Sequence, residues 1–402
     1  MSDAARPDLS EEERLLRDTV REFAQEVVAP GVAQRDEEER FDRSIFTRLA
    51  GLGLTAAPFP ESVGGAGVSY VGWTLAMEEL AAVDMAAAVT LSVHILHQLP
   101  VVSWGTEEQR TRWLPALQAG EALGAFALTE PSAGSDAAAI RTLARRVDGD
   151  GRELPPDAPA DAVAGYRLSG TKIWISNAPD AERYLVFATL DPTRGVSGIT
   201  AFLVEKGTPG FRFGAHERKM GIRSCPAAEL VFENAEVPAA NRLGDEGQGY
   251  RIALSALGEG RISIAAACVG LARSALEQAA AYVQQREAFG RPLSEQQGLR
   301  FMLAEMSREV AAARALTREA AAARDRGEPL AEVSSLAKWT ASDAAMRVTT
   351  DAVQLFGGAG YSRETGIERL MRDAKGAQIY EGTNQVHRLI VAEHLLRRTR
   401  PA

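Results

Sequence analysis

The stretch QIYEGTNQ, residues 378–385, places a carboxylate between an aromatic residue and a glycine. Most glutamates lie on solvated surfaces and take no part in chemistry. Here Gly382 lets a ligand approach the backbone closely, and Thr383 and Asn384 add two small hydrogen-bonding side chains. Glu381 could therefore act as a general base, provided that its surroundings raise its pKa above the ordinary value of about 4.3.

A second polar group occurs in AFALTEPSAGSD, residues 125–136, where helical patterning gives way to strand patterning. Thr129 offers a hydroxyl and a backbone amide, Gly134 permits close approach of a ligand, and Ser135 can donate a hydrogen bond. An ordinary Pro–Gly turn uses the same residue types, and spacing alone favours that interpretation.

The run KIWISNA, residues 172–178, predicts a strand with Trp174 between two isoleucines. A strand tryptophan usually fills a core, and for this motif alone core packing is the favoured interpretation. The alternative is one wall of a pocket for an aromatic ligand, because Ser176 and Asn177 give the strand a polar end.

Two further segments could hold a phosphorylated ligand. In QREAFGRPLSEQQ, residues 285–297, Arg286 and Arg291 could bind phosphate while Phe289 lies against an adenine. Arginines also favour a helix C-terminus for electrostatic reasons, so the two interpretations are comparable. The glycines of QLFGGAGY, residues 354–361, suit either a helix C-cap or close approach of backbone to a ligand.

Several common site types are not indicated. No G-x-G-x-x-G follows a strand, which excludes a Rossmann site, and no G-x-S-x-G elbow supports a hydrolase triad. His94 and His97 have no third ligand in a metal pattern, so we expect structural histidines and no metal. Cys225 and Cys268 form no metal or redox spacing.

The elements that must position these residues fall into three zones, which predict domains at 1–122, 123–240 and 241–402. The first is helical, with a capping box at Ser10 and Glu13 and a stop at Pro30. The second has short β-branched and aromatic runs, which predict an antiparallel sandwich or barrel. The third predicts a four-helix bundle, with helices at 253–285, 294–326, 329–356 and 384–398.

Composition is that of a globular protein: 402 residues, 46% hydrophobic, 25% charged and a net charge of −9. The acidic balance argues against nucleic acid and anionic membranes as partners. The charged start of the chain lacks an apolar signal core, and we expect no stretch near the length of a membrane span. A cytoplasmic location is the expectation.

Together, LTEPSAGSD, KIWISNA, REAFGRPL, QLFGGAGY and IYEGTNQ, in this order over nearly the whole chain, resemble the acyl-CoA dehydrogenase family. The resemblance implies an α+β multidomain fold, with an N-terminal helical domain, a middle antiparallel β-domain and a C-terminal four-helix bundle. It implies non-covalent FAD, an acyl-CoA substrate, electron-transfer flavoprotein as electron acceptor, and a homotetramer built as a dimer of dimers. Short-chain and branched-chain bacterial members, of β-oxidation and branched-chain amino acid catabolism, have the most similar pattern.

The same resemblance assigns roles residue by residue. Glu381 matches the base that removes the α-proton of the thioester while flavin N5 accepts the β-hydride. The substrate contacts implied are Ser135, Arg261, Tyr380 and Gly382. The implied FAD contacts are Phe126, Leu128, Thr129, Trp174, Ile175 and Ser176 near the flavin, and Arg286, Phe289 and Gln297 near the pyrophosphate and adenine. Gln354, Gly357 and Gly358 would receive the FAD of a partner subunit, and Thr383, Asn384 and Gln385 would touch the adenosine or pyrophosphate.

Two positions bear on alternatives. Some family members carry the base at the position of Gly260, where this chain has none, and the adjacent Glu259 would point elsewhere on a helix. Gly258 lacks the acidic or amide side chain that commonly contacts CoA, which favours a carrier-protein-bound substrate slightly. An acyl-CoA oxidase, a flavin monooxygenase and a non-catalytic acyl-CoA-binding protein remain alternatives, although an intact Glu381 counts against the last two.

Overall fold

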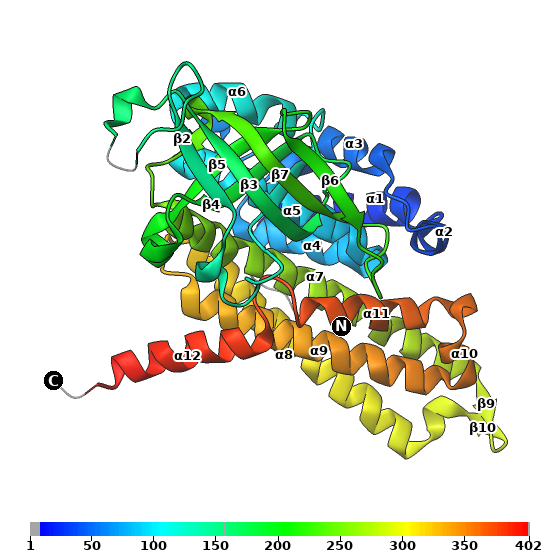
Figure 1. Ribbon diagram of the computed structural model, residues 1–402. Helices are drawn as coiled ribbons and strands as arrows, with labels where there is room; N and C mark the ends of the chain where they lie inside the picture. Colours follow the sequence, from blue (N-terminus) through cyan, green and yellow to red (C-terminus); the bar gives the residue numbers. More distant parts are fainter. Residues whose placement is uncertain (1–8, 156–157, 401–402) are drawn as a thin grey trace.

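The computed structural model describes residues 9–155 and 158–400 and arranges them as helices, then a sheet, then helices (Figure 1). The N-terminal part begins with the predicted capping box: Ser10 Oγ accepts from the Glu13 amide at 3.1 Å, and Glu13 accepts from the Ser10 amide at 3.0 Å. A π-helical turn extends the first helix to Val28, so the run ends before Pro30 as predicted. The helices are α1 (Glu11–Phe23), α2 (Val32–Glu37), α3 (Arg43–Gly51), α4 (Tyr70–Val83), α5 (Met85–Trp104) and α6 (Glu107–Gln118).

The expectation about membrane-span length needs correction. Two helices, α5 and α7 (Gly249–Gln285), are long and apolar enough to cross a membrane by length and composition alone. Of their most apolar windows, 89% and 78% are buried inside the protein. A helix packed on all sides needs apolar residues around its whole circumference, so this composition is that of a core helix.

The middle part forms one mixed sheet in the order β6-β7-β3-β2-β4-β5-β8, with β1 beside β4. Most pairs are antiparallel, as predicted, but β1–β4 and β2–β4 are parallel. The prediction assumed that parallel pairs need helical crossovers; here other strands of the sheet make the connections. The strands are β1 (Gly124–Ala127), β2 (Leu143–Val147), β3 (Gly165–Ser176), β4 (Arg183–Thr189), β5 (Ile199–Glu205), β6 (Phe211–His216), β7 (Ala227–Pro238) and β8 (Arg242–Leu243).

The C-terminal part confirms the four predicted helices but adds two that the sequence analysis missed, the short α10 (Gly358–Tyr361) and the longer α11 (Ile367–Ala377). The predicted helices are α7, α8 (Gln297–Asp325), α9 (Ala331–Phe356) and α12 (Asn384–Arg398). A small hairpin of β9 (Glu287–Ala288) and β10 (Arg291–Pro292) joins α7 to α8. The missed α11 packs on α7 and α9, whereas α12 projects from the body (Figure 1).

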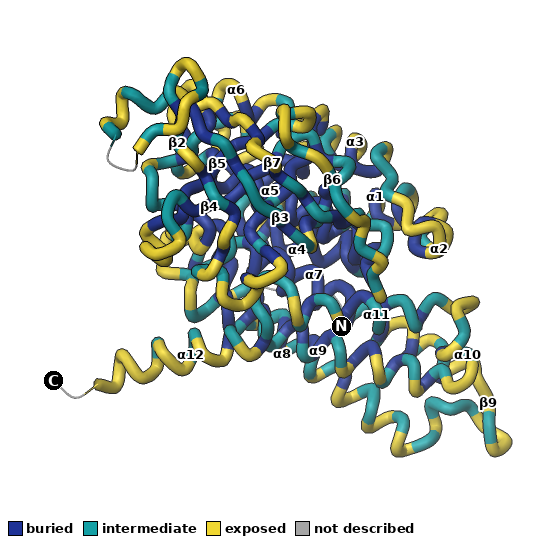
Figure 2. Tube along the Cα trace, in the orientation of Figure 1, coloured by how far each residue is buried: buried dark blue, intermediate teal, exposed yellow. Residues whose placement is uncertain are grey.

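Buried residues concentrate where α4, α5 and α7 lie between the sheet and the outer helices (Figure 2). Helix α7 packs against α4 and α5 on one side and α8 and α9 on the other. A side chain brought to α7 from another segment is therefore enclosed by several elements at once. The turn that carries Glu381 docks against this helix.

Candidate active site

The turn between α11 and α12 holds Glu381 in a left-handed backbone conformation. Its φ is 54°, and that of Gly382 is 97°. Non-glycine residues adopt positive φ rarely, and such positions cost on the order of 1 kcal/mol or more. Thr383 caps α12 by accepting a hydrogen bond from the Val386 amide at 3.4 Å. The turn thus directs Glu381 toward α7 instead of leaving it on a solvated helix face.

The carboxylate of Glu381 occupies space that Gly260 of α7 leaves open. A Cβ at position 260 would lie 2.8 Å from Glu381 Oε2 and 3.1 Å from Leu96 Cδ1 of α5. Position 260, where some family members carry the base, thus has no carboxylate in this chain, and its missing side chain leaves room for Glu381. The adjacent Glu259 points elsewhere, as predicted, and accepts a hydrogen bond from Arg324 Nε on α8 at 3.0 Å.

Burial raises the pKa of Glu381 to about 7, while the positive charges of Lys338 and Arg261 oppose that rise. Although the residue as a whole keeps partial exposure, its Oε2 is fully enclosed and has no hydrogen-bond partner among the described residues. Arg261 is buried on α7 and donates from Nε to the Glu381 carbonyl at 3.4 Å. A carboxylate with a free lone pair and a pKa near neutrality can accept a proton from a weak carbon acid.

A buried polar network supports the turn, and sequence reasoning missed its central member. Lys338 of α9 donates from Nζ to the Gly382 carbonyl at 2.8 Å and to Asn384 Oδ1 at 3.3 Å. Asn384 Nδ2 donates in turn to Ser342 Oγ at 3.0 Å and Asp343 Oδ1 at 2.8 Å. The Asn384 side chain is thus engaged within the protein, although it was predicted to contact a cofactor.

Two further residues at the turn are His387, which the sequence analysis did not single out, and Tyr380, which it predicted as a substrate contact. His387 of α12 is fully buried, and its ring lies where a Cβ on Gly382 would approach Cε1 to 3.1 Å. Burial lowers the pKa of His387 to about 3, so the ring is neutral. Tyr380 has a buried hydroxyl without a hydrogen-bond partner among the described residues.

The LTEP and KIWIS segments lie side by side in the β-domain. The Ile173 amide donates to the Thr129 carbonyl at 3.0 Å. Lys172, fully buried, donates from Nζ to the Leu128 carbonyl at 3.1 Å and pairs with Glu130 at 2.7 Å. A buried ion pair therefore fixes the two segments relative to each other.

Trp174 does not fill the core, so the favoured interpretation of this residue is wrong. Its side chain is 57% exposed and its φ is 58°. By contrast Ile175 is 2% exposed and packs in the core of the sheet, and Leu128 is also buried. Phe126, Thr129 and Ser176 are partly exposed, and Ser135 lies exposed in the following loop.

A pocket of about 260 Å³ opens at the N-terminus of α12. Its lining residues are Asp343, Lys375, Gln378, Ile379, Thr383, Asn384, Gln385 and Arg388. The predicted contacts Thr383, Asn384 and Gln385 thus share one concave surface with two basic side chains. A helix N-terminus beside basic residues favours an anionic ligand group.

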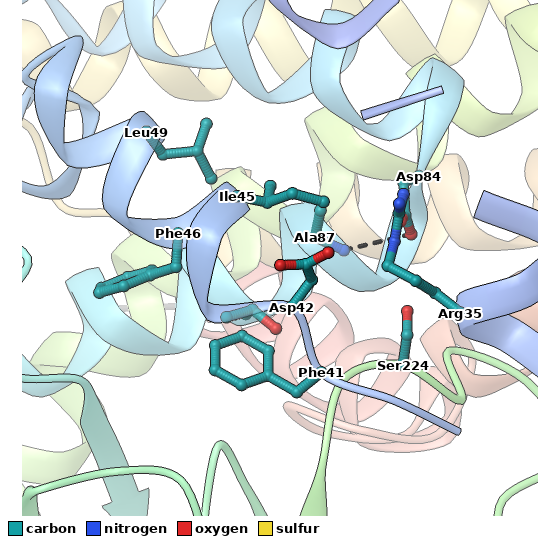
Figure 3. Close-up of a pocket in the computed structure, with 10 residues that line it drawn as sticks. Arg35, Phe41, Asp42, Ile45, Phe46, Leu49, Asp84, Ala87 and Ser224 are labelled. Atoms are coloured by element: carbon teal, nitrogen blue, oxygen red, sulfur yellow. Dashed lines mark hydrogen bonds and ion pairs between the residues drawn. The ribbon is translucent and has the colours of Figure 1, made fainter. Parts of the chain in front are cut away.

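A much smaller pocket, of about 20 Å³, lies between α3 and α5 (Figure 3). Arg35 and Asp84 form a buried ion pair there at 3.3 Å. Asp84 also caps α5 by accepting from the Ala86 amide at 2.9 Å. None of the lining residues is a predicted site residue, so this pocket is separate from the Glu381 site.

Three family models cover most of the chain: acyl-CoA dehydrogenase N-terminal domain at 10–121, middle domain at 125–235, and C-terminal domain at 247–396. The chain belongs to the acyl-CoA dehydrogenase family. A Bacillus subtilis acyl-CoA dehydrogenase is 43% identical over 96% of this chain and 99% of its own. A short-chain-specific acyl-CoA dehydrogenase from Megasphaera elsdenii is 45% identical over 94% of this chain and 96% of its own.

Solved structures share the fold. The butyryl-CoA dehydrogenase of Megasphaera elsdenii superimposes with a TM-score of 0.91 at 43% identity, covering 97% of this chain and 99% of that one. A prolyl acyl carrier protein oxidase, AnaB, gives 0.90 at 31% identity over 96% of this chain and 100% of its own. The predicted fold class is therefore confirmed. The chain is an FAD-dependent oxidoreductase of the family that dehydrogenates acyl-CoA.

The residues present fit FAD, but one chain divides them between two places. Trp174 exposes an indole that could cover a flavin, and Thr383 to Gln385 line the 260 Å³ pocket. Arg286 and Phe289 lie instead on the β9–β10 hairpin, where Phe289 is 96% exposed. From Arg261, beside Glu381, to Arg286 is about 38 Å along α7 at roughly 1.5 Å per residue.

The second FAD group adjoins that hairpin. Tyr282, near the end of α7, stacks on Phe356, at the end of α9, with ring centroids 4.1 Å apart. The exposed residues Gln354, Gly357 and Gly358 therefore lie at the same end of the bundle as the hairpin, and Gln297 begins α8 there. The acyl-CoA dehydrogenase chain thus carries two separate groups of predicted FAD contacts.

Proposed function

We propose that the enzyme converts a short or branched acyl-CoA thioester to its trans-2-enoyl product, with Glu381 as the base that removes the α-proton. The observation that carries this proposal is the enclosed, unpartnered Oε2 of Glu381 beside α7. An ordinary structural carboxylate with that burial would be paired. The pKa of about 7 suits a base that must be ionised before turnover and protonated after it.

The turn also supplies a donor for the charge that develops on the thioester oxygen. The backbone N–H of Glu381 makes no hydrogen bond to any described residue. Gly382, with no side chain, leaves the approach to that N–H open. Preorganised backbone donors of this kind stabilise enolate-like charge in acyl chemistry. When bound, FAD supplies the hydride acceptor, N5, and a ribityl hydroxyl as a second donor.

Each active site is proposed to contain residues from two subunits. Thr383 lies two residues after Glu381 in the same turn, whereas Arg286, Phe289 and Gln354 lie at the far end of the bundle. A second copy that brought its hairpin to the first copy's pocket would complete one FAD site. Helix α12 supports such an assembly, because its apolar residues Leu389, Leu395 and Leu396 are more than half exposed.

The relatives support a substrate preference and an electron acceptor. Short-chain-specific and butyryl-CoA enzymes are among those most similar to this chain. A structure described as the electron transferring flavoprotein of Acidaminococcus fermentans contains a chain 45% identical to this one. We propose electron-transfer flavoprotein as the acceptor, fatty-acid or branched-chain catabolism as the role, a cytoplasmic location and a homotetramer.

One observation favours a second candidate substrate. Gly258 offers no side chain to contact CoA, and the 31% identical AnaB structure is that of an acyl carrier protein oxidase. An acyl group on a carrier protein has no CoA nucleotide, so it would need no side chain at this position to contact one. The same active-site chemistry would then serve a different thioester.

The test is an anaerobic assay of flavin reduction by short, branched and long acyl-CoA thioesters and by acyl carrier protein thioesters. We expect a short or branched acyl-CoA to bleach the flavin fastest and to yield the trans-2-enoyl product. Electron-transfer flavoprotein should reoxidise the flavin faster than oxygen does. Bleaching by carrier-bound substrates alone would overturn the CoA assignment, and bleaching by none would overturn the proposed function.

A further inference from the structure

We propose that Lys338 is a positioning residue for this reaction, which holds the Glu381 turn and places a positive charge near the carboxylate. The proposal rests on the proposed role of Glu381 as the base. Lys338 lies on α9, more than forty positions before the turn, and belongs to none of the motifs that suggested the site. Its role comes from where its ammonium group is placed.

The geometry of the ammonium group is that of a clamp on the turn. Lys338 is fully buried, and its Nζ lies 2.8 Å from the Gly382 carbonyl and 3.3 Å from Asn384 Oδ1. Both acceptors lie within three residues after Glu381, one in the turn and one at the start of α12. The turn contains two successive positive φ angles, and a strained backbone persists only where its surroundings fix it.

A buried ammonium is costly unless its charge has a partner. The pKa of Lys338 is lowered to about 8 by burial, and the charge of Glu381 opposes that shift. Conversely, the charges of Lys338 and Arg261 keep the pKa of Glu381 from rising further. Each residue therefore favours the charged form of the other.

The other ionisable groups around Lys338 leave Glu381 as its main electrostatic partner. From α7, Cys268 is neutral because burial raises its pKa to about 12, and Arg261 is a second cation. On α12, His387 is neutral; in the turn before α12, burial raises the pKa of Tyr380, so its hydroxyl stays protonated. Asp343, on the same helix, instead accepts hydrogen bonds from Gln378, Asn384 and Trp339.

This role differs from a purely structural one in what it predicts about pH. A lysine that only capped two oxygens would, when removed, lower the rate equally at every pH. Loss of a charge beside the base raises the pKa of that base by about one unit or more, so the rate loss is largest below the shifted pKa. The rate loss becomes smaller as the pH rises, because the base ionises again.

The test measures single-turnover flavin reduction by the preferred acyl-CoA from about pH 6 to about pH 9. For Lys338→Met we expect a rate about tenfold lower near neutral pH, a midpoint about one unit or more higher, and partial recovery at alkaline pH. The control is Thr349→Val, since Thr349 is buried on the same helix but bonds only within α9. Thr349→Val should keep the wild-type midpoint and rate.

Two further variants make the result decisive. Ethylammonium added to Lys338→Ala should restore part of the rate, because a free cation can enter the space that the side chain vacates. If Lys338→Met does not fold, Lys338→Arg serves instead; it keeps the charge and should keep the wild-type midpoint. Three results would overturn the proposal. They are an unshifted midpoint in Lys338→Met, a failure of ethylammonium to restore the rate of Lys338→Ala, and a shifted midpoint in Lys338→Arg.

The failure of this inference is distinguishable from that of the proposed function. If Glu381→Gln reduces flavin at the wild-type rate, the assignment of the base is wrong whatever Lys338 does. If Glu381→Gln is inactive but Lys338→Met shows a wild-type pH profile, the base stands and only the positioning role is refuted.

Discussion

At the scale of single residues, Gly260 and Glu381 share one space from distant parts of the sequence. The 2.8 Å separation between a built Cβ and Glu381 Oε2 is shorter than any relaxed contact, and Leu96 closes the other side. Carboxylate placement therefore depends on the missing side chain as much as on the glutamate itself. A substitution at Gly260 should therefore displace the carboxylate of Glu381 without changing Glu381 itself.

Gly260→Ala should lower the rate of flavin reduction by about tenfold or more, because the methyl group displaces the carboxylate from its position near the substrate. Its matched control is Gly258→Ala on the same helix, where the new Cβ would meet only Leu330, at 3.6 Å. We expect that control to gain about 0.5–1 kcal/mol of helix stability and to retain flavin reduction at saturating substrate. Equal rates in the two variants would contradict the shared-space account.

The pH dependence of the reaction should also be set by Glu381. Burial raises the pKa of Glu381 to about 7, so the carboxylate is protonated and inactive below that pH and ionised above it. We expect kcat/KM to rise as the pH increases through about 7, since this parameter reports the free enzyme. A rise centred near the ordinary glutamate pKa, about 4.3, would show that the group is solvated.

At the scale of elements, the turn between α11 and α12 converts a helical hairpin into a site. Sequence patterning located α12 and the residues before it, because Thr383 is a good N-cap and Gly382 breaks a helix. It did not predict α11, which follows a glycine-rich segment and has only eleven residues. Nor could it find Lys338 or His387, since only the folded structure brings their helices to the turn.

Gly382→Ala tests the turn directly. With φ at 97° and His387 only 3.1 Å from the built Cβ, the substitution is both strained and crowded. We expect it to lower thermal stability modestly and to reduce flavin reduction by about tenfold or more, because Glu381 and its N–H move together. Gly327→Ala is the control: φ is +72° but the space is open, so strain should cost stability alone. Comparable activity losses in both variants would contradict this reading of the turn.

The sheet shows where local patterns succeed and fail. Strands β3, β4, β5 and β7 were located because each is a short run of β-branched and aromatic residues between turn residues, although β4 and β5 are buried almost throughout instead of alternating. Their directions were not fully predictable, because β1 and β2 pair parallel to β4 through connections made by other strands. Trp174 was misjudged from its type: the positive φ that turns its indole outward is a property of the folded chain.

At the scale of the whole molecule, one chain separates its predicted FAD contacts into two groups joined by α7. Motif order identified both groups but could not show that Arg286 lies about 38 Å along α7 from Arg261, which lies beside Glu381. The domain boundaries 1–122, 123–240 and 241–402 stay a prediction, as does the tetramer. The division of contacts makes shared active sites the simplest assembly, and that assembly has a genetic test.

Co-production of Glu381→Gln chains with chains carrying Arg286→Ala and Phe289→Ala should restore activity that neither variant has alone. In a mixed dimer one site has both defects and the other has none. Random pairing would therefore restore roughly a quarter of the wild-type activity. Co-production of Glu381→Gln with Glu381→Ala should restore nothing, and equal activity in the two mixtures would contradict shared sites.

The central claim is that Glu381 removes the α-proton, and stopped-flow flavin reduction by Glu381→Gln tests it most directly. The amide is nearly isosteric but cannot accept the proton, and removal of a general base costs about 10² to 10⁴ in rate. We predict a loss in that range, with FAD content and acyl-CoA affinity retained. A variant that reduces its flavin at the wild-type rate would contradict the account.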